Sequence, residues 1–261
     1  GEAQMPATYL AILLAAVGCS VAGMLIIRRY IPPEKLAENN EYVGFTFSML
    51  SLIYGIYLAF TVVVVWQQYE AAEETVTTEV VLMATVWRSV EVLPAEDRDR
   101  LRRDLIAYTR GVIEDDYPLM ATGQKSTFSA HYEKLWEDFY RVQLTSGDAR
   151  QEAFYSEALS RLNEFSIARR SRILASQASL PPSMWVLLIV GAMGAIAFTW
   201  FYSTPYRSIQ IAATAFLSAI IIYAVLLVAM LEYPFGSGVS VGDLPYRELL
   251  ERFESLIKSG G

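Results

Sequence analysis

Two groups of charged residues flank the apolar segments of this chain, and their types and spacing could select an ion. The first group holds three glutamates one to two helical turns beyond Trp66, and the second holds three arginines two to three turns before Pro182. The members are Glu70, Glu73, Glu74, Arg169, Arg170 and Arg172. In a symmetric oligomer each residue repeats as a ring, and an arginine ring gathers anions whereas a glutamate ring gathers cations. The alternative is a set of partly exposed ion pairs, each contributing about 0–1 kcal/mol.

A row of small and hydroxyl-bearing residues lies within the apolar segment 43–66. The row consists of Gly44, Ser48, Ser51 and Gly55 at helical spacing, and Thr61 adds a hydroxyl elsewhere on the helix. Small residues let helix backbones approach closely in a membrane, and hydroxyls form bonds between helices. The same pattern also fits a hydroxyl-lined conduction path. The row therefore predicts either a packing face or the lining of a pore.

The sequence gives little support for metal binding, nucleic-acid binding or catalysis. The chain has one cysteine and one histidine, which excludes a disulfide framework and any cysteine-based or multi-histidine metal centre. The net charge of −7 gives no electrostatic case for binding nucleic acid. We find no nucleophile paired with a base, no glycine loop for a phosphate, and no haem or flavin motif. We therefore expect no catalytic residue, no metal and no cofactor.

Two further acidic features have simple interpretations. Glu79 is expected at the edge of a helical bundle rather than in a site. The acidic run 114–116 could bind Ca²⁺ or Mg²⁺, but contiguous acids on a helix point in different directions. We interpret the run as a solvated helix end.

Four segments without any charged residue must position these groups. They cover residues 3–27, 43–66, 173–206 and 208–231, and the third is interrupted by Pro181 and Pro182. A membrane-spanning helix needs about 20 apolar residues. The segments predict spans over roughly 8–27, 43–66, 184–202 and 208–231, and they exclude a soluble enzyme.

The residues between the second and third spans predict amphipathic helices. No proline or glycine interrupts the chain between Trp66 and Pro94, so span 2 is expected to continue as one long helix out of the membrane. Further helices are expected over 95–117, ended by Pro118, and over 127–145 and 148–179. The expected inner faces are Val76, Val80, Met83, Trp87 and Val90, then Leu101, Leu105, Tyr108 and Val112, then Leu135, Phe139 and Val142, and finally Phe154, Leu162 and Phe165.

The predicted fold is an all-α membrane protein with four transmembrane helices and an extramembrane four-helix bundle inserted between spans 2 and 3. Residues 5–66 hold transmembrane helices 1 and 2, and residues 67–180 form the bundle. Residues 181–231 hold helices 3 and 4, and residues 232–261 form a tail with a short amphipathic helix over 245–258.

Basic residues in the short loops predict the orientation in the membrane. Arg28, Arg29 and Lys35 lie between spans 1 and 2, and Arg207 lies between spans 3 and 4. Short loops rich in lysine and arginine stay in the cytoplasm. We expect a multi-pass protein of the bacterial inner membrane with the bundle and both termini outside the cytoplasm. Arg169, Arg170 and Arg172 argue against this orientation, because basic residues close to span 3 could hold the bundle in the cytoplasm.

Several motifs resemble a four-span bacterial membrane family described as bestrophin-like, and the resemblance covers nearly the whole chain. They are Arg28-Arg29, the segment Gly44–Trp66 with its run Val62–Trp66, Glu79, Arg169-Arg170, Arg172, Leu180-Pro181, Trp185, and Pro234-Phe235-Gly236. The resemblance implies a homo-oligomeric chloride channel with four spans per subunit. The sequence departs from bestrophins because it lacks their aromatic pore-neck pattern and a clustered acidic Ca²⁺ clasp. The predicted topology, with the bundle outside the cytoplasm, also conflicts with the large cytoplasmic region of bestrophins.

The function favoured by these observations is a homo-oligomeric ion channel in the lipid bilayer. Inorganic ions would pass along span 2, and the charged residues at the junction with the bundle would form a selecting collar. The alternatives are a sensory or scaffolding membrane protein, and a structural subunit that docks on a partner membrane subunit.

Overall fold

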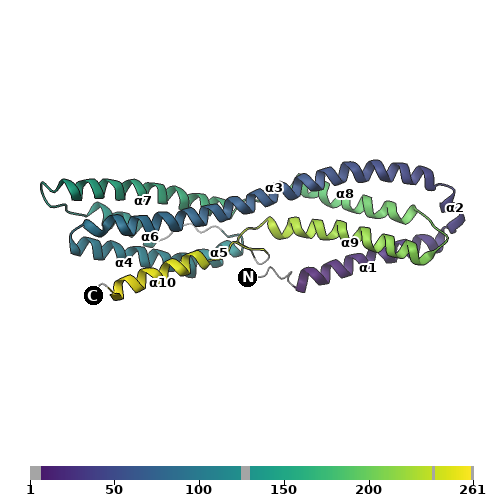
Figure 1. Cartoon of the computed structure of the whole chain (residues 1–261). Helices are drawn as coiled ribbons and strands as arrows, with labels where there is room; N and C mark the ends of the chain where they lie inside the picture. The colour runs from purple at the N-terminus through teal and green to yellow at the C-terminus, as the bar shows by residue number, and fades with distance from the viewer. Residues whose placement is uncertain (1–6, 125–129, 237–238, 260–261) are drawn as a thin grey trace. The chain divides into compact units, whose positions relative to one another are not determined.

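The computed structural model describes residues 7–124, 130–236 and 239–259, and all of the regular structure in these ranges is helical (Figure 1). The chain divides into two compact units. The first comprises Gly1–Gln67 and Ser179–Glu232, and the second comprises Gln68–Ala178 and Tyr233–Gly261. The expected all-α fold is confirmed. The chain ends included in the predicted segments, at 5–6 and 260–261, lie outside the described residues.

The first unit contains the apolar helices and one short polar helix. The apolar helices are α1 (Ala7–Tyr30), the beginning of α3 (Asn40–Ser89), α8 (Pro182–Phe201) and α9 (Arg207–Leu231), and the short helix is α2 (Pro33–Ala37). Helices α1, α3, α8 and α9 are each long and apolar enough to cross a membrane, as expected.

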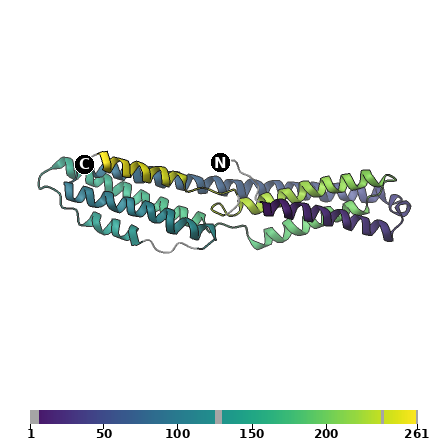
Figure 2. The same cartoon turned by 90° about the horizontal axis from the view of Figure 1, so that it is seen from below.

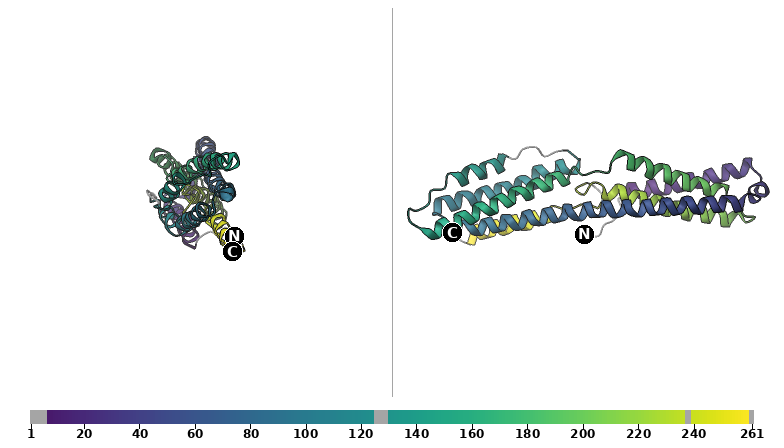
Figure 3. Two further views of the ribbon diagram at one scale, coloured as in Figure 1. Left: turned by 90° about the vertical axis from the view of Figure 1, so that its left-hand side faces the viewer. Right: turned by 90° about the horizontal axis from the view of Figure 1, so that it is seen from above.

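Helix α3 is continuous from Asn40 to Ser89 (Figure 3). The sequence explains this length, because no glycine or proline occurs between Gly55 and Pro94. A 3₁₀ turn at Val90–Val92 ends the helix before Pro94. The prediction of one long helix is confirmed.

In the first unit, aromatic rings from neighbouring helices pack against glycine residues. The ring of Tyr54 on α3 lies against Gly191 on α8, and the ring of Trp200 on α8 lies against Gly23 on α1. The Tyr54 hydroxyl donates to the carbonyl of Leu188 at 3.2 Å. These glycines therefore serve helix packing.

Polar side chains on α9 face α1, its neighbour in Figure 1. The hydroxyls of Ser20 and Ser218 are 2.6 Å apart and buried. Gln210 and Thr214, which precede Ser218 on the same face, are also buried. In the absence of water, such polar groups need partners on other helices.

Side-chain bonds join the ends of the membrane helices. Asn40 donates to the carbonyl of Ser203 at 2.6 Å and accepts from its amide at 2.9 Å. Glu232, at the end of α9, accepts from the amide of Leu180 and from the indole of Trp185, each at 2.9 Å. Each contact satisfies backbone groups where a helix begins or ends.

The second unit is a helical bundle. Besides the bundle part of α3, it contains α4 (Ala95–Gly111), a π-helical segment at Val112–Asp116, α5 (Tyr117–Ala121), α6 (Ala130–Tyr140), α7 (Ala149–Ala175) and α10 (Leu244–Ser259). The helix predicted over 127–145 corresponds to α6. Residues 127–129 lie outside the described residues, and α6 ends at Tyr140, five residues before the predicted end.

The predicted core of the bundle is largely confirmed. All of its residues are buried or packed against the buried cluster except Phe154, which is 41% exposed. The cluster also includes residues of α10, because Phe253 stacks on Trp87 of α3 with ring centroids 4.1 Å apart. In the view of Figure 2, α10 lies in front of the bundle part of α3, and its neighbour in Figure 1 is α4. The sequence predicted this helix but not its place in the core.

The prediction that Pro118 ends a helix is wrong. Pro118 lies in the first turn of α5, directly after the π-helical segment. Proline lacks an amide hydrogen and is tolerated in the first turn, where that hydrogen has no helical partner. The chain therefore continues as a helix through Ala121.

We predict that the G191A variant will lower thermal stability. A Cβ atom at position 191 would lie 2.6 Å from Cε2 of Tyr54, and the buried ring is held by its bond to Leu188. Overpacking of this kind costs about 1–3 kcal/mol. The thermal unfolding midpoint in detergent, followed by circular dichroism, measures the effect.

The matched control is G55A on α3, where a Cβ atom would meet no neighbour within 4 Å. This variant should unfold at the wild-type temperature or slightly above it. Equal loss of stability in both variants would contradict the packing role of Gly191.

Candidate functional site

The row of small residues on α3 is only partly covered within the subunit. Ser48 and Gly55 are exposed, and Gly44 and Ser51 are half-buried. Ser48 donates to the carbonyl of Gly44 one turn earlier at 2.8 Å. Gly44 and Ser48 also line a pocket of about 720 Å³ with residues of α8, α9 and their connecting loop. The row is therefore accessible to a neighbouring subunit, lipid or water.

Thr61 differs from the rest of the row. It is 1% exposed, and its hydroxyl donates to the carbonyl of Tyr57 at 2.9 Å. Its position on another face of the helix explains the difference, because it is not related to Gly55 by a whole number of turns. Within the subunit, Thr61 is a covered residue.

The charged collar is divided in the structure. Glu70, Glu73, Glu74 and Arg170 are exposed. The guanidinium of half-buried Arg169 lies 4.5 Å from the ring centroid of Tyr132, a cation–π geometry.

Glu74 lines a groove with Ala168 and Ser171 of α7. The structure thus brings one predicted glutamate close to the arginine segment. No ion pair is found between the two predicted clusters within the described residues.

Arg172, the remaining collar residue, is fully buried in the bundle. Its Nε donates to Oε2 of Glu79 at 2.7 Å, and its Nη2 donates to Oδ2 of Asp116 at 2.9 Å. The Tyr108 hydroxyl donates to Oε1 of Glu79 at 2.6 Å, and the Met120 sulfur lies 3.3 Å from Nη1. Two carboxylates thus surround this guanidinium, so Arg172 is not an exposed collar residue in this subunit.

The predictions for Glu79 and for Asp116 in the acidic run 114–116 are both wrong in the structure. Glu79 is 0% exposed rather than at the bundle edge, and Asp116 is 4% exposed rather than at a solvated helix end. Both are buried because each neutralises Arg172, and a buried charge needs a partner. We refer to Glu79, Tyr108, Asp116 and Arg172 as the buried ion cluster.

A signal for part of this cluster exists in the sequence. Glu79 lies three residues after Val76 and four before Met83, on the apolar face of its helix. Arg172 lies seven residues after Phe165, on the inner face of α7. Opposite charges on the inner faces of two helices in one bundle indicate a buried pair.

Burial and charge act together on the titratable groups of the cluster. Burial raises the pKa of Tyr108 well above its ordinary value, and the Glu79 carboxylate adds to this effect. Burial alone would lower the pKa of Arg172, but the attraction of Glu79, Tyr246 and Tyr108 and the hydrogen bond to Glu79 together outweigh it, so the pKa lies well above its ordinary value. Arg172 therefore stays charged and Tyr108 stays neutral at physiological pH.

Tyr246 of α10 completes the surroundings of Arg172. Its ring centroid lies 5.7 Å from the guanidinium carbon, and the residue is 0% exposed. Its hydroxyl is buried without a hydrogen-bond partner, unlike that of Tyr108. Burial raises the pKa of Tyr246 well above its ordinary value, with a further contribution from Glu79.

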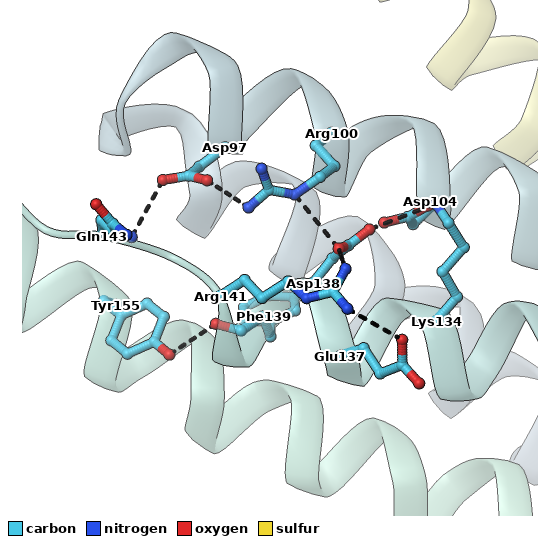
Figure 4. A network of polar contacts seen from close by, with 10 residues as sticks. All are labelled: Asp97, Arg100, Asp104, Lys134, Glu137, Asp138, Phe139, Arg141, Gln143 and Tyr155. Atoms are coloured by element: carbon cyan, nitrogen blue, oxygen red, sulfur yellow. Dashed lines mark hydrogen bonds and ion pairs between the residues drawn. The ribbon is translucent and has the colours of Figure 1, made fainter.

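A second polar network links α4 to α6 (Figure 4). Lys134 pairs with Asp104 and lies 3.4 Å from Asp138, which also pairs with Arg141 at 3.3 Å. Burial raises the pKa of Asp104. Burial acts in the same direction on Asp138, but hydrogen bonds to Asp104 and Lys134 outweigh it and lower its pKa. The network holds two helices together.

No group of three or more histidine, cysteine or acidic side chains in the described part of the chain is arranged to hold a metal ion. The buried ion cluster, with its arginine between carboxylates, fits a structural role.

The comparisons with known proteins identify the family. The Bestrophin-like domain matches residues 14–246. The chain belongs to the Bestrophin-like family. A comparison with curated proteins gives no significant match.

Crystal structures of a bacterial Bestrophin homolog from Klebsiella pneumoniae share the fold of this bestrophin-like chain. One variant of that homolog aligns with a TM-score of 0.69 and 16% identity, covering 98% of this chain and 96% of the other. A structure phased on zinc aligns with a TM-score of 0.68 and 16% identity, covering 92% and 95%. At this identity the likeness shows the fold. The bestrophin-like chain is thus a multi-pass membrane protein whose spans contact lipid.

We predict opposite outcomes for two matched hydroxyl deletions in the bestrophin-like bundle. Y108F should lower stability by about 1–3 kcal/mol, because it removes a buried bond to Glu79. Y246F should leave stability at pH 7 unchanged or slightly higher, because its hydroxyl has no partner to lose. Thermal unfolding of both variants measures the difference.

The dependence of stability on pH above 10 provides a further check of the environment assigned to Tyr246. Because the pKa of Tyr246 is raised in the fold, its contribution is complete below the ordinary value of 10.0 and is lost as pH rises above it. Wild-type stability should therefore fall above pH 10, and that of Y246F should fall less steeply. A stronger loss in Y246F than in Y108F at pH 7 would contradict the assigned contacts.

Proposed function

We propose that this chain is one subunit of a homo-oligomeric ion channel in which α3 lines the path. The observation that supports this most directly is the open row Gly44, Ser48, Ser51 and Gly55, which the subunit's own helices do not cover completely. Serine hydroxyls in such a row can donate hydrogen bonds to a passing anion and so replace part of its hydration. Thr61 is not included in the proposed lining, because it is already covered.

Exposed apolar side chains on the bundle support the assembly of several copies. Ile167 and Leu174, seven residues apart on α7, are 67% and 57% exposed, and Val81 on α3 is 57% exposed. Apolar residues exposed in this way outside a membrane are typical of subunit interfaces. Symmetric copies would turn each exposed charge near the path into a ring.

We propose that the conducted ion is an anion. Arg170 is exposed, and the resemblance to bestrophins implies chloride. Arg172 is not part of the proposed filter, because Glu79 and Asp116 neutralise it. The exposed glutamates Glu70, Glu73 and Glu74 are the competing cation-selective ring, and the reversal potential separates the two.

We expect discrete currents from the purified wild-type chain in planar bilayers, with an anion-selective reversal potential in a salt gradient. S48L should reduce unit conductance at least about twofold by narrowing the path. I53L, at a position 69% exposed on another face of α3, is the matched control and should conduct normally. R170E should shift the reversal potential toward cations.

A monomer that carries no ion flux in liposomes would contradict the channel proposal, and equal loss of current in S48L and I53L would contradict the assigned path along α3. Cation selectivity that E74Q abolishes while R170E leaves it unchanged would contradict the anion filter. That result would keep the channel and move its filter to the glutamates.

We further propose that the chain lies in the bacterial inner membrane with the bundle outside the cytoplasm, because Arg28, Arg29, Lys35 and Arg207 occupy the short loops. In a C19A background, N163C on the bundle should react with an impermeant maleimide on intact spheroplasts, and E38C in the first short loop should react only after lysis. The reverse pattern would place the bundle in the cytoplasm.

A further inference from the structure

Three arginines converge at one end of the membrane helices in the first unit. Arg28 and Arg29 lie in the last turn of α1, and Arg207 is the first residue of α9. Together they line a hollow of about 520 Å³. Its other lining residues are Leu25, Ile26 and Pro33, which are apolar. The hollow therefore combines concentrated positive charge with an apolar wall.

In the part of the chain that the structure describes, no carboxylate forms an ion pair with these guanidinium groups. Arg28 donates to the side-chain oxygen of Gln210 and to the carbonyl of Thr204, the latter at 3.1 Å, and both acceptors are uncharged. Arg29 and Arg207 are exposed and form no ion pair within the described residues. Glu34 on α2 and Glu38, which follows the last residue of α2, do not line the hollow. Three like charges in one place favour a bound anion.

The geometry prepares this site in two ways. The bonds to Gln210 and Thr204 hold Arg28 in position, and Gln210 is itself fixed by donating to the carbonyl of Tyr202 at 2.6 Å. Helix α9 also begins at Arg207 without a capping side chain, so the positive end of its dipole faces this region. A fixed guanidinium and a helix start are the groups that proteins use to bind phosphate.

We propose that Arg28, Arg29 and Arg207 bind a phosphate-bearing anion, with the headgroup of an anionic phospholipid as the natural source. The apolar wall supports a lipid, because acyl chains can lie along α1, where Ile26 is 55% exposed. Basic pockets between membrane helices bind such headgroups. Free inorganic phosphate shares the same chemistry and is the alternative source.

The test measures lipid binding to the full-length protein in mild detergent by native mass spectrometry. The probes are phosphatidylglycerol, zwitterionic phosphatidylcholine, and inorganic phosphate as a competitor. The variant is R29Q/R207Q, which changes two exposed residues without assigned partners and spares Arg28. The matched control is K35Q, which removes one charge from the same loop outside the hollow.

Wild type and K35Q should bind phosphatidylglycerol at least about tenfold more tightly than phosphatidylcholine, and R29Q/R207Q should lose about tenfold of that preference. If phosphate displaces the lipid from wild type and binds with equal affinity, the site holds and free phosphate is its ligand. Equal binding of the two lipids without phosphate binding overturns the proposal, as does an equal loss in K35Q. None of these results depends on ion conduction.

Discussion

A guanidinium without access to water is the constraint on which the bundle depends. Arg172 is fully buried, and an isolated charge in such a place would cost several kcal/mol. Its partners come from three other elements, since Glu79 lies on α3, Tyr108 on α4 and Asp116 at the end of the π-helical segment. One side chain therefore sets the register of four segments, which apolar contacts alone would specify less narrowly.

The membrane helices follow a different rule. With no water available, their polar groups must find partners inside the protein, and small residues allow rings and backbones to approach. Ser20 with Ser218 and Gly191 with Tyr54 satisfy these demands within the subunit. The row on α3 lacks comparable cover, because Ser48 and Gly55 are exposed.

The helices were readable from sequence because their signals are local. Long uncharged segments predict spans, and the spacing of Val76, Met83 and Trp87 predicts a buried face. The buried ion cluster was missed because it joins residues 93 positions apart, and an acid on a helix is more commonly solvated. The place of α10 was also not predictable. An amphipathic pattern indicates that one face of a helix is covered, but it does not indicate which other helix covers that face.

The π-helical segment gives the chain a place where its length can change by one residue. A π turn is equivalent to an α-helical turn that has taken up one extra residue. Removing one residue between Val112 and Asp116 would let the chain return to α-helical geometry, and the residues that follow would stay on the same face of the helix. The same deletion inside a regular α-helix would rotate everything that follows by about 100°. Alignments of related chains should thus treat a one-residue gap in this segment as compatible with an acidic partner for Arg172.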